Sequence, residues 1–139
     1  MTNRRGRILI LGDGNFSFSL ALCRYNDNLK RPEQFAVVAT SFDDADSLLQ
    51  KYPETRSVLH TLETKLGCMV LHEINATQDL LHQLHSGDQF DHIIFNYPHL
   101  GVEDAKLHSH LVGHIFFRLT FALCFWVAII KSRVVSSFM

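Results

Sequence analysis

The sequence of 139 residues lacks the paired cysteines of a zinc site or a disulfide framework. Its three cysteines, Cys23, Cys68 and Cys124, are odd in number and show no C-x-x-C spacing. This pattern predicts free, mostly buried thiols in a reducing compartment. No secretory signal is visible, because the apolar run near the N-terminus is only as long as a strand. We therefore expect a cytoplasmic or nuclear location, the nucleolus included.

The sequence also has little net charge of either sign. Its formal net charge is −1 at pH 7, whereas a strongly basic nucleic-acid-binding domain carries a clear positive excess. A local patch or a further domain could still bind nucleic acid. The small basic cluster of Arg4, Arg5 and Arg7 is interpreted as a solvated tail. Because 47% of the residues are hydrophobic, the chain can build one folded core.

Histidine is abundant, but its spacing does not predict a metal site. The nine histidines include His82 and His85, three apart, and His110 and His114, four apart. No glutamate follows His110, so the H-E-x-x-H motif is absent, and no cysteine pair supports zinc. We expect these histidines to lie on helix faces or on the surface, and we expect no bound metal.

No hydrophobic run is long enough to span a bilayer comfortably. Residues 111–130 are largely apolar, but Arg118 interrupts them. The uninterrupted part, 119–130, is shorter than the roughly 20 residues of a spanning helix. We expect a buried helix and no membrane partner; a C-terminal membrane anchor is the alternative.

Strand-like and helix-like segments alternate along most of the chain. Short apolar runs, typical of strands buried on both faces of a parallel sheet, cover residues 7–11, 35–40, 69–74 and 92–95. Helices are expected over 16–25, from Asp44 or Asp46 to Pro53, over 58–66 with Gly67 after it, and from Thr77 or Asp79 to Leu84. This alternation predicts an α/β fold with a parallel sheet and right-handed crossovers.

The first strand runs directly into a glycine turn that we interpret as a cofactor-binding loop. The turn consists of Gly12, Asp13, Gly14, Asn15, Phe16 and Ser17. Glycine lets the backbone approach a ligand, and the following helix presents free N–H groups there. The dinucleotide fingerprint would need glycine in place of Ser17, which disfavours NAD and FAD. A G-x-G turn followed by phenylalanine is more typical of S-adenosylmethionine sites; an ordinary strand-to-helix turn is the alternative.

Polar residues follow the second and third strands, at the sheet edge where ligands of parallel sheets bind. Asp43 is expected to accept hydrogen bonds from ribose hydroxyls, while Asp44 caps the next helix. Asn75 and Ala76 are expected to contact the adenine edge. The alternative for this segment is a helix cap formed by Thr77.

The loop after the fourth strand combines groups suited to chemistry on a base. Asn96, Tyr97, Pro98 and His99 supply an amide, an aromatic ring, a rigid turn and an imidazole. Together they could hold a flat base, and His99 could accept a proton because imidazole titrates near neutral pH. We interpret these four residues as catalytic; a loop merely made rigid by Pro98 is the alternative.

Together, these motifs resemble the Rossmann-like domain of eukaryotic large-subunit ribosomal RNA uridine-N(3) methyltransferases, which also occurs fused to a ferredoxin-fold anticodon-binding domain. The matching segments are 8–19, 39–43, 51–53, 75–77 and 90–101. The resemblance extends over residues 5–117. It implies a three-layer class I methyltransferase sandwich, S-adenosylmethionine as cofactor, RNA as partner and base methylation as the reaction.

Two departures from the family pattern shape the remaining expectations. Asn75 stands where the family usually shows aspartate, and the later strands of the fold are not recognisable from about residue 118 onward. We expect a domain over 1–117, truncated in its C-terminal half, and an atypical apolar tail over 118–139. The truncation predicts weak or no methyl transfer by this chain. An inactive S-adenosylmethionine- or RNA-binding module and a Rossmann oxidoreductase are the alternatives.

Overall fold

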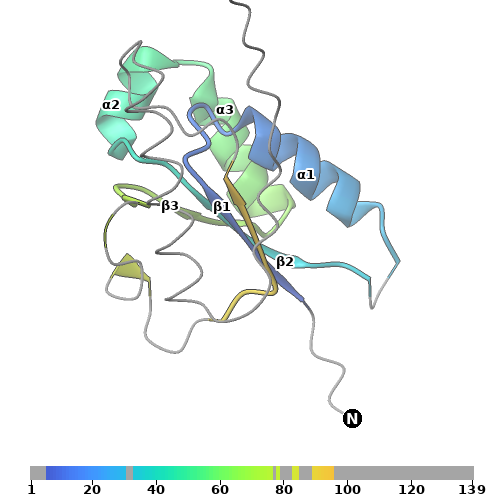
Figure 1. Cartoon of the computed structure of the whole chain (residues 1–139). Helices are drawn as coiled ribbons and strands as arrows, with labels where there is room; N and C mark the ends of the chain where they lie inside the picture. The colour runs from blue at the N-terminus through green and yellow to red at the C-terminus, as the bar shows by residue number, and fades with distance from the viewer. Residues whose placement is uncertain (1–5, 31–32, 77, 79–82, 85–88, 96–139) are drawn as a thin grey trace, which may run out of the picture.

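The computed structural model describes residues 6–30, 33–76, 78, 83–84 and 89–95 (Figure 1). Over these residues the chain forms a four-stranded sheet and the helices that connect its strands. The strands are β1 (Arg7–Leu11), β2 (Ala36–Thr40), β3 (Met69–Leu71) and β4 (His92–Phe95). The helices are α1 (Ser17–Asp27), α2 (Ala45–Lys51) and α3 (Thr55–His60), the last continuing into the π-helical turn η1 (Thr61–Lys65).

The sheet has the strand order β3-β2-β1-β4, and every pairing is parallel. β1 pairs with β2 from Arg7↔Ala36 onward and with β4 from Ile8↔His92 onward. The order reverses between β1 and β4, because the chain first builds outward through β2 and β3. Ligands of open parallel sheets bind beyond the carboxyl ends of the strands at such a reversal. We therefore expect a ligand-binding site beyond the carboxyl ends of β1 and β4.

Side chains of the strands alternate between two cores, one on each face of the sheet. Ile8 and Ile10 of β1 pack on the face that α1, α2, α3 and η1 cover, whereas Leu9 and Leu11 pack on the other (Figure 1). The opposite core also holds Ile74, Ala76, Leu84 and Phe90. Because both faces are apolar, the strands read as continuous hydrophobic runs. Burying a side chain as large as Leu9 contributes about 1.5–3 kcal/mol.

The strand predictions are confirmed, with two shifted boundaries. β1 and β4 have the predicted bounds, and β2 begins one residue later than expected. β3 ends at Leu71 rather than at residue 74, because the chain turns at Glu73, which has a φ of 59°. This turn directs the Ile74 N–H to the carbonyl of Ser41 instead of to a further ladder partner.

The helix predictions are also confirmed in place, with shifted ends. α1 begins one residue after Phe16 and extends to Asp27. The helix expected over 58–66 begins earlier, at Thr55, and Gly67 ends it with a φ of +60°. The helix expected to end at Leu84 falls mostly outside the described residues, and so does the apolar segment 111–130. In the described part of the chain, no helix is long and apolar enough to cross a bilayer.

The amino end of the sheet is closed by contacts between β1 and β4. The Arg7 N–H donates to Asp91 Oδ2 at 2.7 Å, and the Asp91 N–H donates to the Arg7 carbonyl. The Arg7 guanidinium lies 4.7 Å from the centre of the Phe90 ring. These contacts between β1 and β4 stabilise the end of the sheet that lies away from the expected site.

Cys23 and Cys68 are free, buried thiols of the helix-side core, as predicted.

Candidate cofactor-binding site

The turn after β1 requires glycine at its first position. Gly12 has a φ of +62°, and a Cβ atom there would lie 2.6 Å from Cε2 of Phe95. Both the left-handed backbone and the ring exclude a larger residue without strain. Because Phe95 ends β4, this contact joins the carboxyl ends of the two strands between which the sheet order reverses.

Gly14 differs from Gly12, because nothing described in the protein fills the space beside it. Its φ is not positive, and no described atom lies within 4 Å of a Cβ built on it. The neighbouring Asp13 and Phe16 N–H groups donate to the carbonyls of Thr40 and Asp13. Among the described residues, the N–H groups of Gly14 and Asn15 have no acceptor. Two free N–H groups beside open space can bind an anion such as a carboxylate.

Asp13 was predicted to bind the cofactor, and the structure shows its carboxylate bonded within the protein. Its Oδ2 accepts hydrogen bonds from the Ser19 N–H and the Ser19 hydroxyl, both at 2.6 Å. The residue is only 8% exposed. Ser19 lies in the first turn of α1, where N–H groups have no partner within the helix. Asp13 therefore acts as a side-chain cap for α1, because it accepts from an N–H group of the first helical turn.

Phe16 shapes the same turn with its side chain in the core. It precedes α1 with a φ of 61°, which costs about 1–2 kcal/mol for a residue other than glycine. Its ring is fully buried and meets His72 edge-on at 5.8 Å between ring centres. Burial of the ring offsets the strain, since it contributes about 1.5–3 kcal/mol. Beside it, Ser17 is exposed and donates its N–H to the Asn15 side chain.

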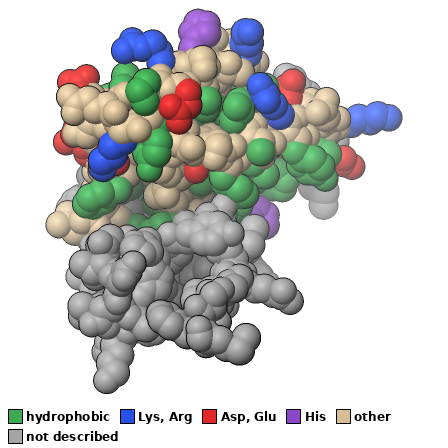
Figure 2. All heavy atoms as spheres, turned by 90° about the horizontal axis from the view of Figure 1, so that it is seen from above, with side chains coloured by type: hydrophobic (Ala, Val, Ile, Leu, Met, Phe, Trp, Pro, Cys, Tyr) green, Lys and Arg blue, Asp and Glu red, His purple; other side chains and the backbone are tan. Residues whose placement is uncertain are grey.

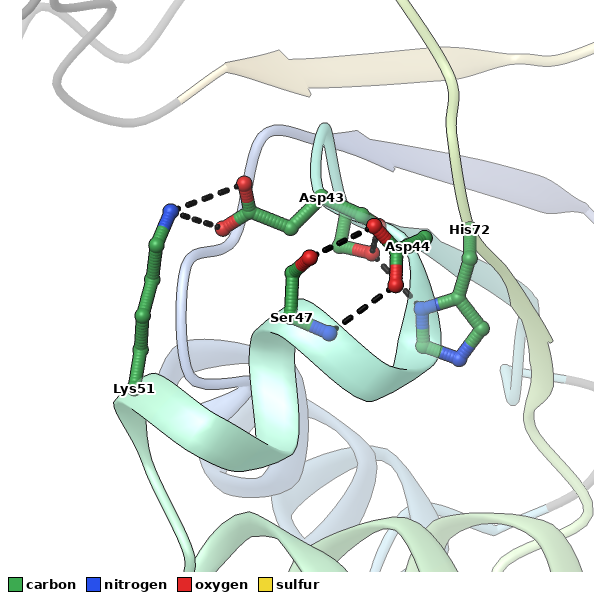
Figure 3. Close-up of polar contacts among 6 residues, drawn as sticks. Asp43, Asp44, Ser47, Lys51 and His72 are labelled. Atoms are coloured by element: carbon green, nitrogen blue, oxygen red, sulfur yellow. Dashed lines mark hydrogen bonds and ion pairs between the residues drawn. The ribbon is translucent and has the colours of Figure 1, made fainter.

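Asp44 caps α2, as predicted, which leaves Asp43 for another role. The Asp44 carboxylate accepts from the Ser47 N–H at 2.9 Å and from the Ser47 hydroxyl at 2.6 Å (Figure 3). These bonds lower the pKa of Asp44 below its ordinary value, because they favour the charged carboxylate. The ambiguity between Asp44 and Asp46 as the cap is resolved in favour of Asp44.

The Asp43 carboxylate faces Lys51 across the end of α2 (Figure 3). Lys51 Nζ donates to Oδ1 and to Oδ2, at 2.9 Å each. The side chains of Asp43 and Lys51 are 25% and 55% exposed. The hydrogen bonds to Asp43 raise the pKa of the Lys51 ammonium. Asp43 thus presents two acceptor oxygens on one partly exposed edge of its carboxylate.

The backbone of Asp43 is fixed by a network that links the ends of β2 and β3. The Asp43 carbonyl accepts from the Ser41 hydroxyl at 2.8 Å and from the Glu73 N–H at 3.3 Å. Because the hydroxyl has one proton, His72 Nδ1 must be the donor in its 2.7 Å bond to Ser41 (Figure 3). The left-handed backbone of Glu73 is part of this arrangement. Asp43 can therefore reorient its side chain while its main chain stays in place.

The loop after β3 lies beside this network. The Gln83 side chain holds the backbone of Asn75, accepting from its N–H at 2.7 Å and donating to its carbonyl at 3.0 Å. Ala76 is buried in the core on the face of the sheet opposite α1, α2 and α3. Phe42 is 66% exposed next to Asp43, and a flat ligand could stack on such a ring. The adenine contact predicted for Asn75 and Ala76 stays a prediction.

The residues predicted to be catalytic lie outside the described residues. They are Asn96, Tyr97, Pro98 and His99, which follow β4 directly in the sequence. Sequence reasoning did not identify Lys51 or His72 as part of the site. One sequence feature could have identified Lys51, since it lies in the short segment 51–53 that matches the family. No sequence feature identifies His72, because its bond to Ser41 depends on which strands are neighbours in the sheet.

Figure 2 views the side of the molecule on which the turn after β1 lies. Acidic and basic side chains are interspersed over its described surface rather than gathered by sign. The described residues contain no group of three or more histidine, cysteine, aspartate or glutamate side chains that could hold a metal ion.

The parallel sheet, its reversal of order beside β1 and the polar turns at its carboxyl edge define a Rossmann-like methyltransferase domain of the α/β class. The chain belongs to the BMT5-like family, described as rRNA (uridine-N3-)-methyltransferase BTM5-like, whose pattern matches residues 9–122. The match begins within β1, includes every later described element through β4 and continues through 96–99.

Two proteins of Arabidopsis thaliana are similar to this chain. "Heavy metal-associated isoprenylated plant protein 41" is 35% identical over 106 residues, which is 76% of this chain and 19% of that protein. "Uncharacterized protein At4g26485" is 34% identical over 95 residues, which is 68% of this chain and 43% of that protein. The chain thus spans about a fifth of the first relative and less than half of the second.

Proposed function

We propose that this chain binds S-adenosylmethionine at the carboxyl edge of its sheet and takes part in methylating N3 of uridine in ribosomal RNA. One observation carries the proposal: the turns after β1 and β2 present complementary polar groups at the same edge. The first offers the N–H groups of Gly14 and Asn15, which have no acceptor in the part of the chain that the structure describes. The second offers the paired oxygens of Asp43.

The chemistry of these groups fits the cofactor. N–H groups suit a carboxylate, and a carboxylate with two acceptor oxygens suits two vicinal ribose hydroxyls. The open space at Gly14 would be filled by any side chain there, so glycine leaves room for a ligand. Within 43–51 the chain carries three aspartates, Asp43, Asp44 and Asp46, and one lysine, Lys51, which favours a ligand of net positive charge.

Once bound, S-adenosylmethionine supplies an electrophilic methyl group. The part of the protein is to hold the uridine nitrogen in line with that group and to exclude water. In the loop after β4, we assign His99 to accept the N3 proton, Asn96 to hydrogen-bond the uracil edge and Tyr97 to stack on the base. These roles follow from the family resemblance and from the place of the loop in the sequence.

The first experiment is to titrate the purified protein with S-adenosylmethionine in a calorimeter, with NADH as a second ligand. Asp43→Asn is expected to weaken binding about ten- to hundredfold, because it removes hydrogen bonds to a charged acceptor. Asp46→Asn is the matched control, since it removes the same charge from an exposed position one turn away. It is expected to leave the affinity within about twofold.

A second experiment measures transfer of labelled methyl to ribosomal RNA and identifies 3-methyluridine in the product. Cofactor binding without transfer would support a non-catalytic module in place of an enzyme. Binding of NADH instead of S-adenosylmethionine would indicate an oxidoreductase. A folded protein that binds neither ligand would contradict the proposal.

A further inference from the structure

The ion pair at the end of α2 occupies the edge of Asp43 that a ribose would use. Lys51 Nζ is equidistant from the two carboxylate oxygens, at 2.9 Å from each, and so lies in front of both (Figure 3). Two vicinal hydroxyls that donate one bond to each oxygen need the same edge. The ammonium and the ribose are therefore competitors for one carboxylate.

We propose that Lys51 is a placeholder, which satisfies Asp43 in the free protein and is displaced by the cis-diol of the incoming cofactor. The inference rests on the proposed function, because it assumes that a ribose binds at Asp43. It adds a residue to the site whose effect on affinity is opposite to that of Asp43. Removing the acceptor weakens binding, whereas removing the competitor strengthens it.

The pair is built so that the lysine can leave at low cost. Lys51 is 55% exposed, and exposed ion pairs contribute little because water solvates both partners. Its flexible stem extends from the last turn of α2, so the ammonium can move without moving the helix. A pair worth so little to stability points to a role in the site rather than in the fold.

The acceptor, in contrast, stays in place when the lysine leaves. The Asp43 main chain is held through the Ser41 hydroxyl and the Glu73 N–H. The neighbouring Asp44 is already engaged as the cap of α2, since both of its oxygens accept from Ser47. Displacement therefore exchanges one pair of donors for another at a carboxylate whose main chain stays in place.

The test compares Lys51→Met with Lys65→Met, which removes the same charge at the end of η1, near the amino end of β3. Calorimetry with S-adenosylhomocysteine is expected to show about two- to fivefold tighter binding for Lys51→Met, since the competing pair is a weak one. Lys65→Met is expected to bind like the wild type. Lys51→Arg, which keeps a two-donor partner for Asp43, is expected to bind no more tightly than the wild type.

A second set of ligands separates competition from simple charge removal. In NMR titrations, Lys51→Met is expected to bind adenosine more tightly than the wild type does, by the same factor. It is expected to bind 2′,3′-dideoxyadenosine, which lacks the diol, with unchanged affinity. An equal gain for both nucleosides would overturn the proposal in favour of a general charge effect. Weaker binding by Lys51→Met would also overturn the proposal and would make Lys51 a positioning residue. Unchanged binding would overturn it as well.

The proposal can also be tested on the wild-type protein, by following the Lys51 side chain during the titration. The Lys51 ammonium pKa is raised by Asp43, so it is expected to fall toward its ordinary value when S-adenosylhomocysteine is added, as followed by NMR of the lysine side chain. A Lys51 signal that stays unchanged in the saturated complex would overturn the placeholder while leaving the proposed function intact. Failure of the folded wild type to bind any of these ligands would overturn both.

Discussion

The turn after β1 and the turn after β2 each contain an aspartate that sequence reasoning assigned to the cofactor, but the two carboxylates do different work. Asp13 is 8% exposed and accepts two hydrogen bonds from Ser19. Asp43 is 25% exposed, and its carboxylate accepts from the Lys51 ammonium at the end of a long, flexible side chain. In the first turn the carboxylate supports the fold, and in the second it forms a partly exposed ion pair where we propose that the cofactor binds.

The backbones of the two turns show the reverse arrangement. After β1 the N–H groups of Gly14 and Asn15 are free among the described residues. After β2 the carbonyl of Asp43 is bonded to the Ser41 hydroxyl and the Glu73 N–H. Each turn thus uses one kind of group to hold its shape and offers the other kind to a ligand. The variants below test this division of labour.

The largest effect on stability is expected when Gly12 of the first turn is replaced by alanine, and Gly14 provides the comparison. Gly12→Ala combines a left-handed backbone with a contact of 2.6 Å to the Phe95 ring. It is expected to reduce the free energy of unfolding by about 2–5 kcal/mol, measured by urea denaturation. Gly14→Ala, with no described atom within 4 Å, is expected to change stability by less than about 0.5 kcal/mol.

The same pair is expected to separate stability from binding. Gly14→Ala fills the space beside the free N–H groups and is expected to weaken S-adenosylmethionine binding about tenfold or more, because a misplaced ligand loses its hydrogen bonds. A Gly14→Ala protein that binds the cofactor normally would show that the first turn does not face it. A Gly12→Ala protein as stable as the wild type would refute the role assigned to the Phe95 contact.

The two aspartates provide the next comparison. Asp13→Ala leaves the Ser19 N–H and hydroxyl buried without an acceptor, so it is expected to reduce the free energy of unfolding by about 2–3 kcal/mol. Asp43→Ala removes only a surface ion pair and is expected to unfold within about 1 kcal/mol of the wild type. Asp13→Asn, which keeps one acceptor oxygen, should recover part of the loss. Equal stability of the two alanine variants would contradict the division between the turns.

Sequence reasoning located the strands well because their signals are local. β1 and β4 are short apolar runs with polar residues at their ends, and both have the predicted bounds. Asp44 was one of two candidates for the α2 cap, and the choice depended only on which carboxylate reaches Ser47. Such features depend on a few neighbouring residues, so a sequence can specify them.

The parts of the site that were missed depend on contacts between distant segments. Nothing local shows that Phe16 has a positive φ, since burial of its ring in the core offsets the strain. The bond from His72 to Ser41 exists because β2 and β3 are neighbours in the sheet. The bond from Ser19 to Asp13 was missed because it depends on the shape of the turn, and the cofactor contact predicted for Asp13 stays a prediction.

The smallest effect is expected at the cap of α2, next to Asp43. The Ser47 hydroxyl and N–H lower the pKa of Asp44 from its ordinary value of 3.8. A lowered pKa means that the carboxylate stabilises the fold above pH 3.8 and that this contribution is lost as the pH falls through the pKa of the folded state. Asp44→Ala should therefore be less stable than the wild type at pH 7, with the difference shrinking below pH 3.8.

Asp44→Asn separates the cap from its charge. Asparagine accepts the same hydrogen bond from Ser47 without titrating, so this variant should approach wild-type stability at pH 7 and keep its advantage over Asp44→Ala in acid. Urea denaturation at both pH values measures the three proteins. A constant difference between wild type and Asp44→Ala across this range would mean that the cap does not depend on the charge. The contrast between the neighbouring carboxylates would then come from geometry alone: Asp44 is turned toward Ser47, and Asp43 is turned toward Lys51.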